Sequence, residues 1–467
     1  MKRSLRNITS FLVGDAGSRV VGFLITIYLA RVLAPSAFGL INIGIAVLGY
    51  LALAASPGIQ ILETRNVATA LGAMSDRVGA VLSLRVLLAL ILFLLTAVVA
   101  TFAFESVATR LVIILYALSL FPYAILLDWF YQGREEFPLV SGSRLGNYVV
   151  YGVGAVMLVR AQGDVWLTPV AFLFGNAVGS VVLFVMYRRQ HGNIQFSWQP
   201  AAWRDILRQN VPVGFAMFLS QSVSNLPPLV IGLLLGARNV GMFSAAMKLV
   251  FLVLIIDRLF NALFLPAVTR YFVSRTEEVP FLLSVTLKLV LFLLLPLLVI
   301  AVVVSPEAIA LVFGSGYEEA SPLLRVLLGY VLLTVVNSVF VCTLIGAGLE
   351  RRFTRAIMIG TAILAVAVVG LTFVFGTVGG AVGVLVGEGS TLLLMIVEVT
   401  RITRLPPLPD MLRPFGATAA MAITGALLVN ANHSLGIAAS VVVFFLVAML
   451  TGGIRKEEIR YLRERIV

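Results

Sequence analysis

Residues 17–39 read GSRVVGFLITIYLARVLAPSAFG, an apolar run in which Arg19 and Arg31 are the only charged residues. An α-helix rises about 1.5 Å per residue, so a run of this kind is long enough to cross the hydrocarbon core of a bilayer. The stretch predicts a transmembrane helix followed by a turn near LAPSAFG. Arg19 then lies roughly 15 Å from the nearer end of the helix, and its presence at that depth needs a reason.

The composition of the whole chain places it in a membrane. Of the 467 residues, 60% are hydrophobic and 12% are charged, and the mean hydropathy is +1.05. No water-soluble domain of this size sustains such a composition. The apolar runs of about 18 to 25 residues are typical of transmembrane helices and too long for barrel strands. We predict an all-α integral membrane protein with about fourteen spans, the first of them retained rather than cleaved as a signal peptide.

Lysine and arginine residues indicate the orientation of these spans. Most of those between spans fall on one face of the predicted membrane, together with the N-terminal Lys2, Arg3 and Arg6. The opposite face holds only Arg31, Arg110, Arg160, Arg238 and Arg325. The positive-inside rule therefore predicts cytoplasmic termini. It also assigns the net charge of +12 to contact with anionic lipid, so we expect no nucleic-acid partner.

Residues that commonly carry enzyme chemistry are scarce. Cys342 is the only cysteine, and His191 and His433 fall in different predicted loops on opposite faces. This distribution argues against a disulfide, a zinc site and a histidine-based catalytic triad. The longest stretch predicted between spans, residues 187–209, is too short for a catalytic domain. We therefore predict no catalytic residue, no metal site and no enzyme activity.

Two pairs of similar stretches indicate an internal repeat. LAPSAFGLI at 33–41 aligns without gaps to LGARNVGMF at 235–243, so that Gly39 corresponds to Gly241. GREEF at 133–137 resembles GLERRF at 348–353, with one inserted residue. Both pairs occur at equivalent places in the predicted topology. They predict one six-helix unit used twice in the same orientation, with a pseudo-twofold axis along the membrane normal.

The repeat predicts the organisation of the chain. We expect an N-terminal six-helix bundle at 1–187, a cytoplasmic linker at 188–209, a C-terminal six-helix bundle at 210–401, an extra helix pair at 402–454 and an amphipathic cytoplasmic tail at 455–467. Two parallel halves are typical of secondary transporters that rock about a central cavity.

Three stretches resemble a known family. They are SRVVGFLITIYLARVLAPSAFG at 18–39, LVFGSGYEEASPLLRVL at 311–327 and GTVGGAVGVLVGEG at 376–389. The chain resembles polysaccharide transporters, the Wzx-type lipid-linked oligosaccharide flippases of the multidrug, oligosaccharidyl-lipid and polysaccharide exporter superfamily. It resembles the MurJ-type lipid II flippases more distantly.

The resemblance implies a function. A protein of this kind moves an undecaprenyl-diphosphate-linked oligosaccharide from the inner to the outer leaflet of a bacterial cytoplasmic membrane by alternating access. Its partners would be this lipid-linked oligosaccharide, membrane lipids and the polysaccharide polymerase machinery, and we expect a monomer. No G-x-x-x-x-G-K-[ST] loop is present, so an ion gradient, the membrane potential or product removal must supply the energy.

Charged residues within the spans are candidates for binding the diphosphate. An arginine at membrane depth usually faces a bundle interior and has a partner. Arg19 either binds the diphosphate through its planar donors or forms an ion pair with Asp15, one helical turn away. Other cations within the spans also have two interpretations. Their long side chains either bind the diphosphate or extend to the membrane surface; these residues are Arg85, Arg144, Arg258 and Lys248.

Acidic residues within the spans are candidates for ion coupling. Asp15, Asp257 and Glu388 lie in predicted spans, where a carboxylate carries a proton or binds a cation. The alternative for Glu388 is a structural hydrogen bond to a neighbouring helix. We expect no cofactor besides a coupling ion, H⁺ or Na⁺.

Two further features concern movement. Pro227 and Pro228 lie within a predicted span, where they either form a hinge or fix a static kink. Residues 305–323 combine an apolar stripe with acidic residues and predict an amphipathic segment that either gates a cavity or packs on the bundle.

Two other functions remain open from the sequence. A multidrug or ion antiporter related to the same superfamily would favour acidic or aromatic cavity walls, whereas the charged residues in these spans are more often basic. A membrane enzyme, such as a polyprenyl-glycan polymerase or ligase, would need a larger outer loop than residues 305–321 provide.

Overall fold

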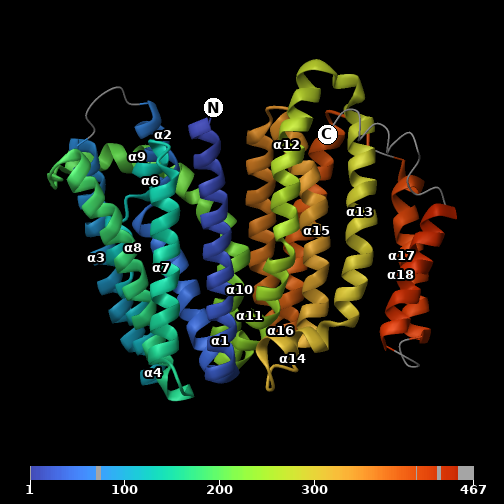
Figure 1. The fold of residues 1–467 in the computed structure, drawn as a ribbon, viewed down its shortest axis with the longest axis horizontal. Helices are drawn as coiled ribbons and strands as arrows, with labels where there is room; N and C mark the ends of the chain where they lie inside the picture. Colours follow the sequence, from blue (N-terminus) through green and yellow to red (C-terminus); the bar gives the residue numbers. More distant parts are fainter. Residues whose placement is uncertain (1, 70–74, 406, 429–432, 451–467) are drawn as a thin grey trace. The chain divides into compact units, whose positions relative to one another are not determined.

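The computed structural model describes residues 2–69, 75–405, 407–428 and 433–450, and this part of the chain contains helices and no strand (Figure 1). The predicted tail at 455–467 lies outside the described residues. The chain divides into two compact units. The first comprises Met1–Ser244 with Val312–Gly316, and the second comprises Ala245–Leu311 with Tyr317–Val467.

The first unit is built from ten α-helices, a short 3₁₀ helix and the start of α11. They are α1 (Lys2–Ala55), α2 (Ile59–Thr69), α3 (Ser75–Ala103), α4 (Val107–Leu118), α5 (Leu120–Ile125), α6 (Asp128–Gly133), α7 (Phe137–Leu158), η1 (Gln162–Trp166), α8 (Leu167–His191), α9 (Pro200–Ser220), α10 (Ser222–Leu235) and α11 (Ala237–Val253).

The second unit contains the rest of α11 and the helices that follow it. They are α12 (Ile255–Ser274), η2 (Thr276–Glu278), α13 (Val279–Val303), α14 (Ser305–Phe313), α15 (Ala320–Gly346), α16 (Glu350–Thr400), α17 (Leu408–Leu428) and α18 (His433–Leu450).

The described part holds eight helices that are long and apolar enough to cross a membrane, or nine if the bent pair α9 and α10 forms one span. This count is lower than about fourteen partly because two long helices each join two predicted spans. The backbone of α1 leaves the helical region at Ala34, and that of α16 leaves it at Gly376. Both breaks fall at predicted turns. The number of spans stays a prediction.

The outer surface of several helices is apolar. Phe102 on α3, Leu263 on α12 and Phe373 on α16 are 86%, 74% and 79% exposed. So many exposed large apolar side chains are rare on a soluble monomer. They are the surface that a membrane protein presents to lipid hydrocarbon.

The two repeat stretches have the same local backbone. Ala34 has φ 60° and ψ 169°, and the aligned Gly236 has φ 86° and ψ 172°. An alanine with positive φ is strained, whereas glycine adopts this region readily. Both residues end one helix and start another, so the sequence echo corresponds to a shared helix break.

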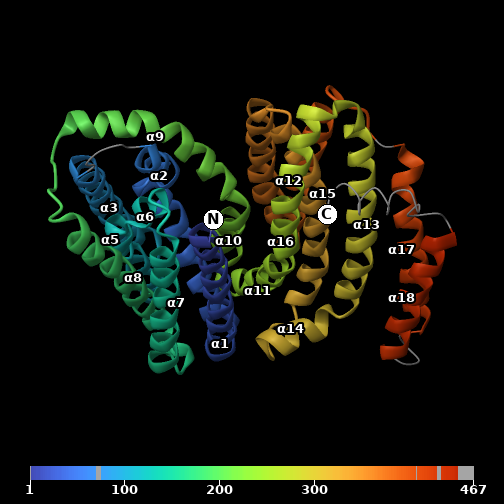
Figure 2. The same ribbon diagram turned by 45° about the horizontal axis from the view of Figure 1, so that its top comes forward.

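A buried ion pair ties three helices together at one end of the first unit. Figure 2 shows α9 running across the ends of α2 and α3. Arg77 of α3 donates two hydrogen bonds to the fully buried Glu63 of α2, at 2.7 and 2.8 Å. Asn210 of α9 donates a third, at 3.4 Å. This Glu63 cluster fixes α9 to the bundle.

Candidate functional site

A polar cavity of about 340 Å³ lies inside the first unit. Because one of its walls carries Arg19, we name it the Arg19 pocket. Helices α1, α7 and α8 and the α5–α6 connection line it with Ser18, Arg19, Tyr123, Leu126, Asp128, Ser143, Arg144, Asn147, Tyr148, Asn176, Gly179 and Ser180. A cavity with so many polar side chains is unusual within a bundle of apolar helices and marks a candidate binding site.

Arg19 lies on the α1 side of this pocket. Its side chain is exposed, while the neighbouring Ser18 is buried and donates to the Gly14 carbonyl at 2.7 Å. Arg19 also interacts with other residues of the chain. The side chain of Asp15 lies outside the described residues, so the Asp15–Arg19 pair stays a prediction.

Arg144 faces the same pocket from α7. Its guanidinium donates to Asp128 Oδ2 at 3.3 Å, and its side chain is 36% exposed. Asp128 Oδ1 accepts the backbone N–H of Trp129 at 2.9 Å, which caps the first turn of α6. The carboxylate thus positions Arg144, whose side chain is partly exposed at the pocket.

Arg85 lies behind the pocket wall. It is only 5% exposed, and its guanidinium donates to the carbonyls of Leu126, at 2.8 Å, and Tyr123. These carbonyls occur where the span leaves the helical region between α5 and α6, and that of Tyr123 also accepts the Leu126 N–H at 3.3 Å. Arg85 therefore stabilises the helix break between α5 and α6, which forms one wall of the pocket.

The described charges around the pocket are mainly positive. Three arginines, Arg19, Arg85 and Arg144, lie in or behind its walls. Asp128 is the acidic residue among those that line it, and it interacts electrostatically with both Arg144 and Arg85. Guanidinium groups are suited to phosphate because their planar donors bind two oxygens at once. The pocket favours an anionic ligand over a cationic one.

Sequence reasoning missed the amide side of this pocket. Asn147 Nδ2 donates to Asn176 Oδ1 at 2.9 Å, and Asn176 Nδ2 donates to the Phe172 carbonyl at 2.9 Å. Ser143 Oγ donates to the Gly179 carbonyl at 2.8 Å. A signal was present, because Ser143 and Asn147, like Asn176 and Ser180, are spaced four residues apart and share a helix face.

The other predicted cations belong to the second unit. Arg258 on α12 is exposed, and Lys248 on α11 is half-buried. Neither residue lines a pocket described in this unit. The structure does not bring them together with Arg19, Arg85 and Arg144 within one unit.

Two predicted coupling residues meet in one polar network of the second unit. Asn261 Nδ2 donates to Asp257 Oδ2 at 3.0 Å and to Ser338 Oγ at 3.2 Å. Asn337 Nδ2 donates to Glu388 Oε1 at 2.9 Å, and the two carboxylates lie within electrostatic range of each other. We name this group, which joins α12, α15 and α16, the Asp257–Glu388 network.

The network holds buried oxygen atoms without a hydrogen-bond partner. Among the described residues these atoms are Asp257 Oδ1 and Asn337 Oδ1. Carboxylate, amide and hydroxyl oxygens are ligands for hard cations, and each would also accept a proton donor. Within the described residues, no group of three or more His, Cys, Asp and Glu residues is arranged to hold a metal ion.

The predicted hinge residues lie within a helix near a sharp bend. Helices α9 and α10 meet at Gln221 with a bend of 61°. Pro227 and Pro228 follow inside α10, where both are buried. The largest change of direction therefore precedes the proline pair by six residues.

Comparison with known sequences identifies the family. The sequence profile of the family described as polysaccharide biosynthesis protein matches residues 4–272, which is more than half of the chain. The chain belongs to the polysaccharide biosynthesis protein family. A comparison with curated proteins gave no significant match.

Solved structures identify the fold that this family member adopts. A structure titled lipid II flippase MurJ, inward closed conformation, has a TM-score of 0.76 and 14% identity, covering 98% of this chain and 99% of its own. An inward-facing multidrug resistance MATE family transporter of the MOP superfamily has a TM-score of 0.65 and 17% identity, covering 82% and 94%. A MOP superfamily transporter from Pyrococcus furiosus has a TM-score of 0.53 and 16% identity, covering 85% and 95%.

These likenesses confirm the predicted fold class. The protein is a multi-pass membrane protein that is helical where the structure describes it, with the fold of MurJ and MATE transporters. At 14 to 17% identity, they carry no information about the ligand of the Arg19 pocket.

Proposed function

We propose that this protein is a flippase for undecaprenyl-diphosphate-linked oligosaccharide, which it moves from the inner to the outer leaflet of a bacterial cytoplasmic membrane. The observation that carries the proposal is the Arg19 pocket, in which Arg19 and Arg144 line one cavity inside an apolar helical unit. The family description, polysaccharide biosynthesis protein, supports a glycan as cargo.

The chemistry of the pocket suits the head of such a lipid. A diphosphate carries several acceptor oxygens, and two guanidinium groups offer planar donors for them. The amide of Asn147 and the hydroxyls of Tyr148 and Ser180 line the same space, where they suit the hydroxyl groups of the first sugar. The apolar surface of the unit lets the polyprenyl chain remain in the bilayer while the head enters.

The membrane potential favours export of this cargo. Moving one elementary charge across 100 mV changes the free energy by about 2.3 kcal/mol. A diphosphate diester carries about two negative charges, and the cytoplasm is the negative side. Outward movement is therefore favoured by roughly 4 to 5 kcal/mol at 100 mV.

Return of the empty protein needs its own driving force, and we assign this role to the Asp257–Glu388 network. Binding of one monovalent cation there would neutralise one of the two carboxylate charges and weaken the repulsion between them. H⁺ and Na⁺ both suit its oxygen atoms. The bend at Gln221 and the proline pair 227–228, all within the first unit, are the places where we expect a hinge.

The alternatives are less well supported by the site. A multidrug antiporter that binds organic cations would need an anionic pocket, whereas Arg19 and Arg144 line this one. A polymerase or ligase would need catalytic side chains on an extramembrane surface, and we expect no such activity. We also expect the protein to act as a monomer that delivers its product to polymerase machinery.

The proposal is tested by transport in proteoliposomes. The purified protein is reconstituted with a fluorescent undecaprenyl-diphosphate oligosaccharide, and the fraction accessible to a membrane-impermeant quencher is followed over time. A fluorescent polyprenyl glycoside without phosphate serves as the control lipid. We expect transport of the diphosphate lipid alone. Failure to move it, or equal movement of both lipids, would contradict the proposal.

A further inference from the structure

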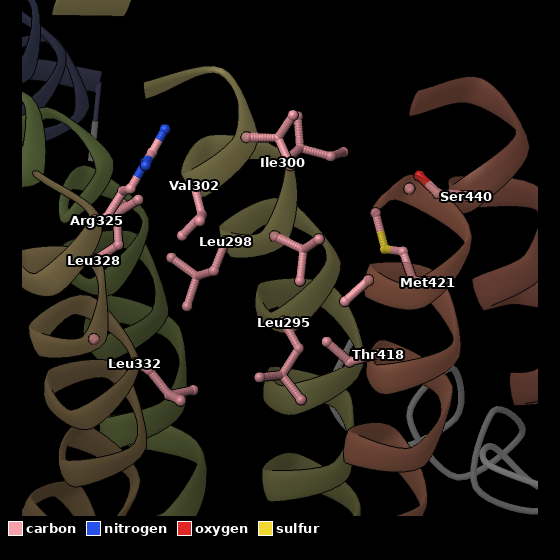
Figure 3. A pocket seen from close by; sticks show the side chains of 15 residues that line it. Leu295, Leu298, Ile300, Val302, Arg325, Leu328, Leu332, Thr418, Met421 and Ser440 are labelled. Atoms are coloured by element: carbon pink, nitrogen blue, oxygen red, sulfur yellow. The ribbon is translucent and has the colours of Figure 1, made fainter. Parts of the chain in front are cut away.

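A second cavity, lined almost entirely by apolar residues, lies within the second unit. It measures about 550 Å³ and is bordered by α13, α15, α17 and α18 (Figure 3). Its only polar side chains are those of Arg325, Thr418 and Ser440. It shares no residue with the Asp257–Glu388 network. We name it the Arg325 crevice.

Arg325 is held at one end of this crevice. Figure 3 shows its side chain beside Val302, near the end of α13. Its Nε donates to Ser305 Oγ at 3.0 Å, and Ser305 Oγ lies 3.2 Å from Ser321 Oγ. The side chain is exposed, and within the described part of the chain its two terminal NH₂ groups have no acceptor. A positioned cation thus lies at the edge of an apolar space.

The size of the crevice selects among hydrocarbon chains. A methylene group fills about as much space as a water molecule in the liquid, roughly 30 Å³. The crevice therefore has room for about 18 such groups. A fatty acyl chain of about 16 to 18 carbons fits this volume as a whole, whereas only about a third of the roughly 55 carbons of an undecaprenyl chain would fit.

We propose that the Arg325 crevice binds one membrane phospholipid, with an acyl chain between α13, α15 and α17 and its phosphate on Arg325. The phosphate supplies acceptors for the terminal NH₂ groups of Arg325, and the chain packs against the apolar walls of the crevice. The positive-inside rule predicts that Arg325 lies on the outer face, so we expect the lipid to come from the outer leaflet.

The bound lipid has a structural consequence. The helix pair α17–α18 packs on α13 through a small apolar core of Phe292, Ala417, Met421, Phe444 and Ala448. The crevice lies beside this core, so an acyl chain in it extends the contact between the pair and the rest of the unit. The proposal does not depend on the transported substrate.

Native mass spectrometry of the full-length protein tests the proposal. The protein is delipidated in detergent and titrated with phosphatidylglycerol, with diacylglycerol of the same chains, or with undecaprenyl phosphate. We expect retention of one phosphatidylglycerol and about tenfold weaker retention of diacylglycerol, because the phosphate contact is lost. We expect undecaprenyl phosphate not to displace the phospholipid.

Three variants locate the site. Arg325→Gln should weaken phosphatidylglycerol retention about tenfold and leave diacylglycerol retention unchanged. Ala422→Trp, which fills the crevice from α17, should weaken both. Arg160→Gln removes another exposed arginine of the predicted outer face and should change neither.

Two results would overturn the proposal. One is phosphatidylglycerol retention that is equal in the parent and in Arg325→Gln, whose exposed side chain lets the variant fold. The other is displacement of phosphatidylglycerol by an equal concentration of undecaprenyl phosphate, which would assign the crevice to the cargo lipid. Neither result bears on whether the Arg19 pocket supports transport.

Discussion

Gly39 and Gly241 make equivalent close contacts, each with the backbone of the other's segment. A Cβ atom on Gly39 would overlap the carbonyl group of Ala237, and a Cβ atom on Gly241 would overlap the carbonyl group of Pro35. Pro35 and Ala237 are themselves equivalent in the alignment of 33–41 with 235–243. The contact is therefore reciprocal, as at a twofold axis, and the two helix breaks pack directly against each other.

Adding a methyl group to either glycine should destabilise the protein. We expect Gly39→Ala and Gly241→Ala each to lower the free energy of unfolding by about 1 to 3 kcal/mol or more, because a backbone carbonyl cannot move away as a flexible side chain does. Thermal unfolding in detergent, followed by fluorescence-detected size exclusion, measures the effect.

Gly146 on α7 provides the matched control. A Cβ atom there meets no other atom within 4 Å, so Gly146→Ala should leave stability unchanged or raise it slightly. Equal melting temperatures for Gly39→Ala, Gly241→Ala and Gly146→Ala would show that the two helix breaks do not pack as described.

The Glu63 cluster should behave as a buried ion pair. Glu63→Gln leaves Arg77 without its carboxylate, but Arg77 is 35% exposed and regains some water. We therefore expect a loss of about 1 to 3 kcal/mol, below the full penalty of a buried unpaired charge. Arg401→Gln, which breaks a surface pair with Glu398, should cost less than about 1 kcal/mol.

A double-mutant cycle separates pairing from packing in this cluster. The variant Glu63→Gln/Arg77→Gln should recover part of the stability lost in Glu63→Gln, because no unpaired charge remains. Strict additivity of the two single substitutions would refute a coupled pair between α2 and α3.

Arg85 and Arg19 should respond differently to substitution. Arg85 binds the carbonyls of Tyr123 and Leu126, so Arg85→Ala should lower the melting temperature by several degrees. Arg19 is exposed, so Arg19→Ala should have little effect on unfolding. A melting temperature that falls in Arg19→Ala but not in Arg85→Ala would reverse the assignment of their roles.

The Asp257–Glu388 network should set the ion dependence of transport. Glu388→Gln keeps the hydrogen-bonding shape of the side chain and removes its charge, so transport should lose its response to a Na⁺ or a pH gradient across the vesicle. Glu398→Gln changes a carboxylate at the end of the same helix and should retain that response. Gradient-dependent transport by Glu388→Gln would exclude Glu388 from coupling.

The sequence predicted the class of fold because hydropathy and repeat signals are local. The runs of apolar residues, the break at Ala34 and the equivalence of Gly39 with Gly241 were all visible in the one-dimensional pattern. The continuation of α1 past Ala34 and of α16 past Gly376 was not visible, because the local sequence does not show the direction that the chain takes after a helix break.

The site was predicted only in part, because charge at membrane depth does not specify orientation. Arg19 and Arg144 line one pocket, whereas Arg85 lies behind its wall against carbonyls freed by a broken helix. That break depends on tertiary packing. The pair Asn147–Asn176 was not predicted, because only the packing of α7 on α8 brings the two amides together.

Transport of the fluorescent undecaprenyl-diphosphate oligosaccharide by Arg19 variants tests the central claim most directly. Arg19→Ala should reduce the rate by about tenfold or more, and Arg19→Lys should retain part of it, since an ammonium keeps the charge without the planar donors. Arg160→Ala, an exposed arginine outside the pocket, should transport at the parent rate. Transport by Arg19→Ala at the parent rate would contradict the assignment of the Arg19 pocket to the diphosphate.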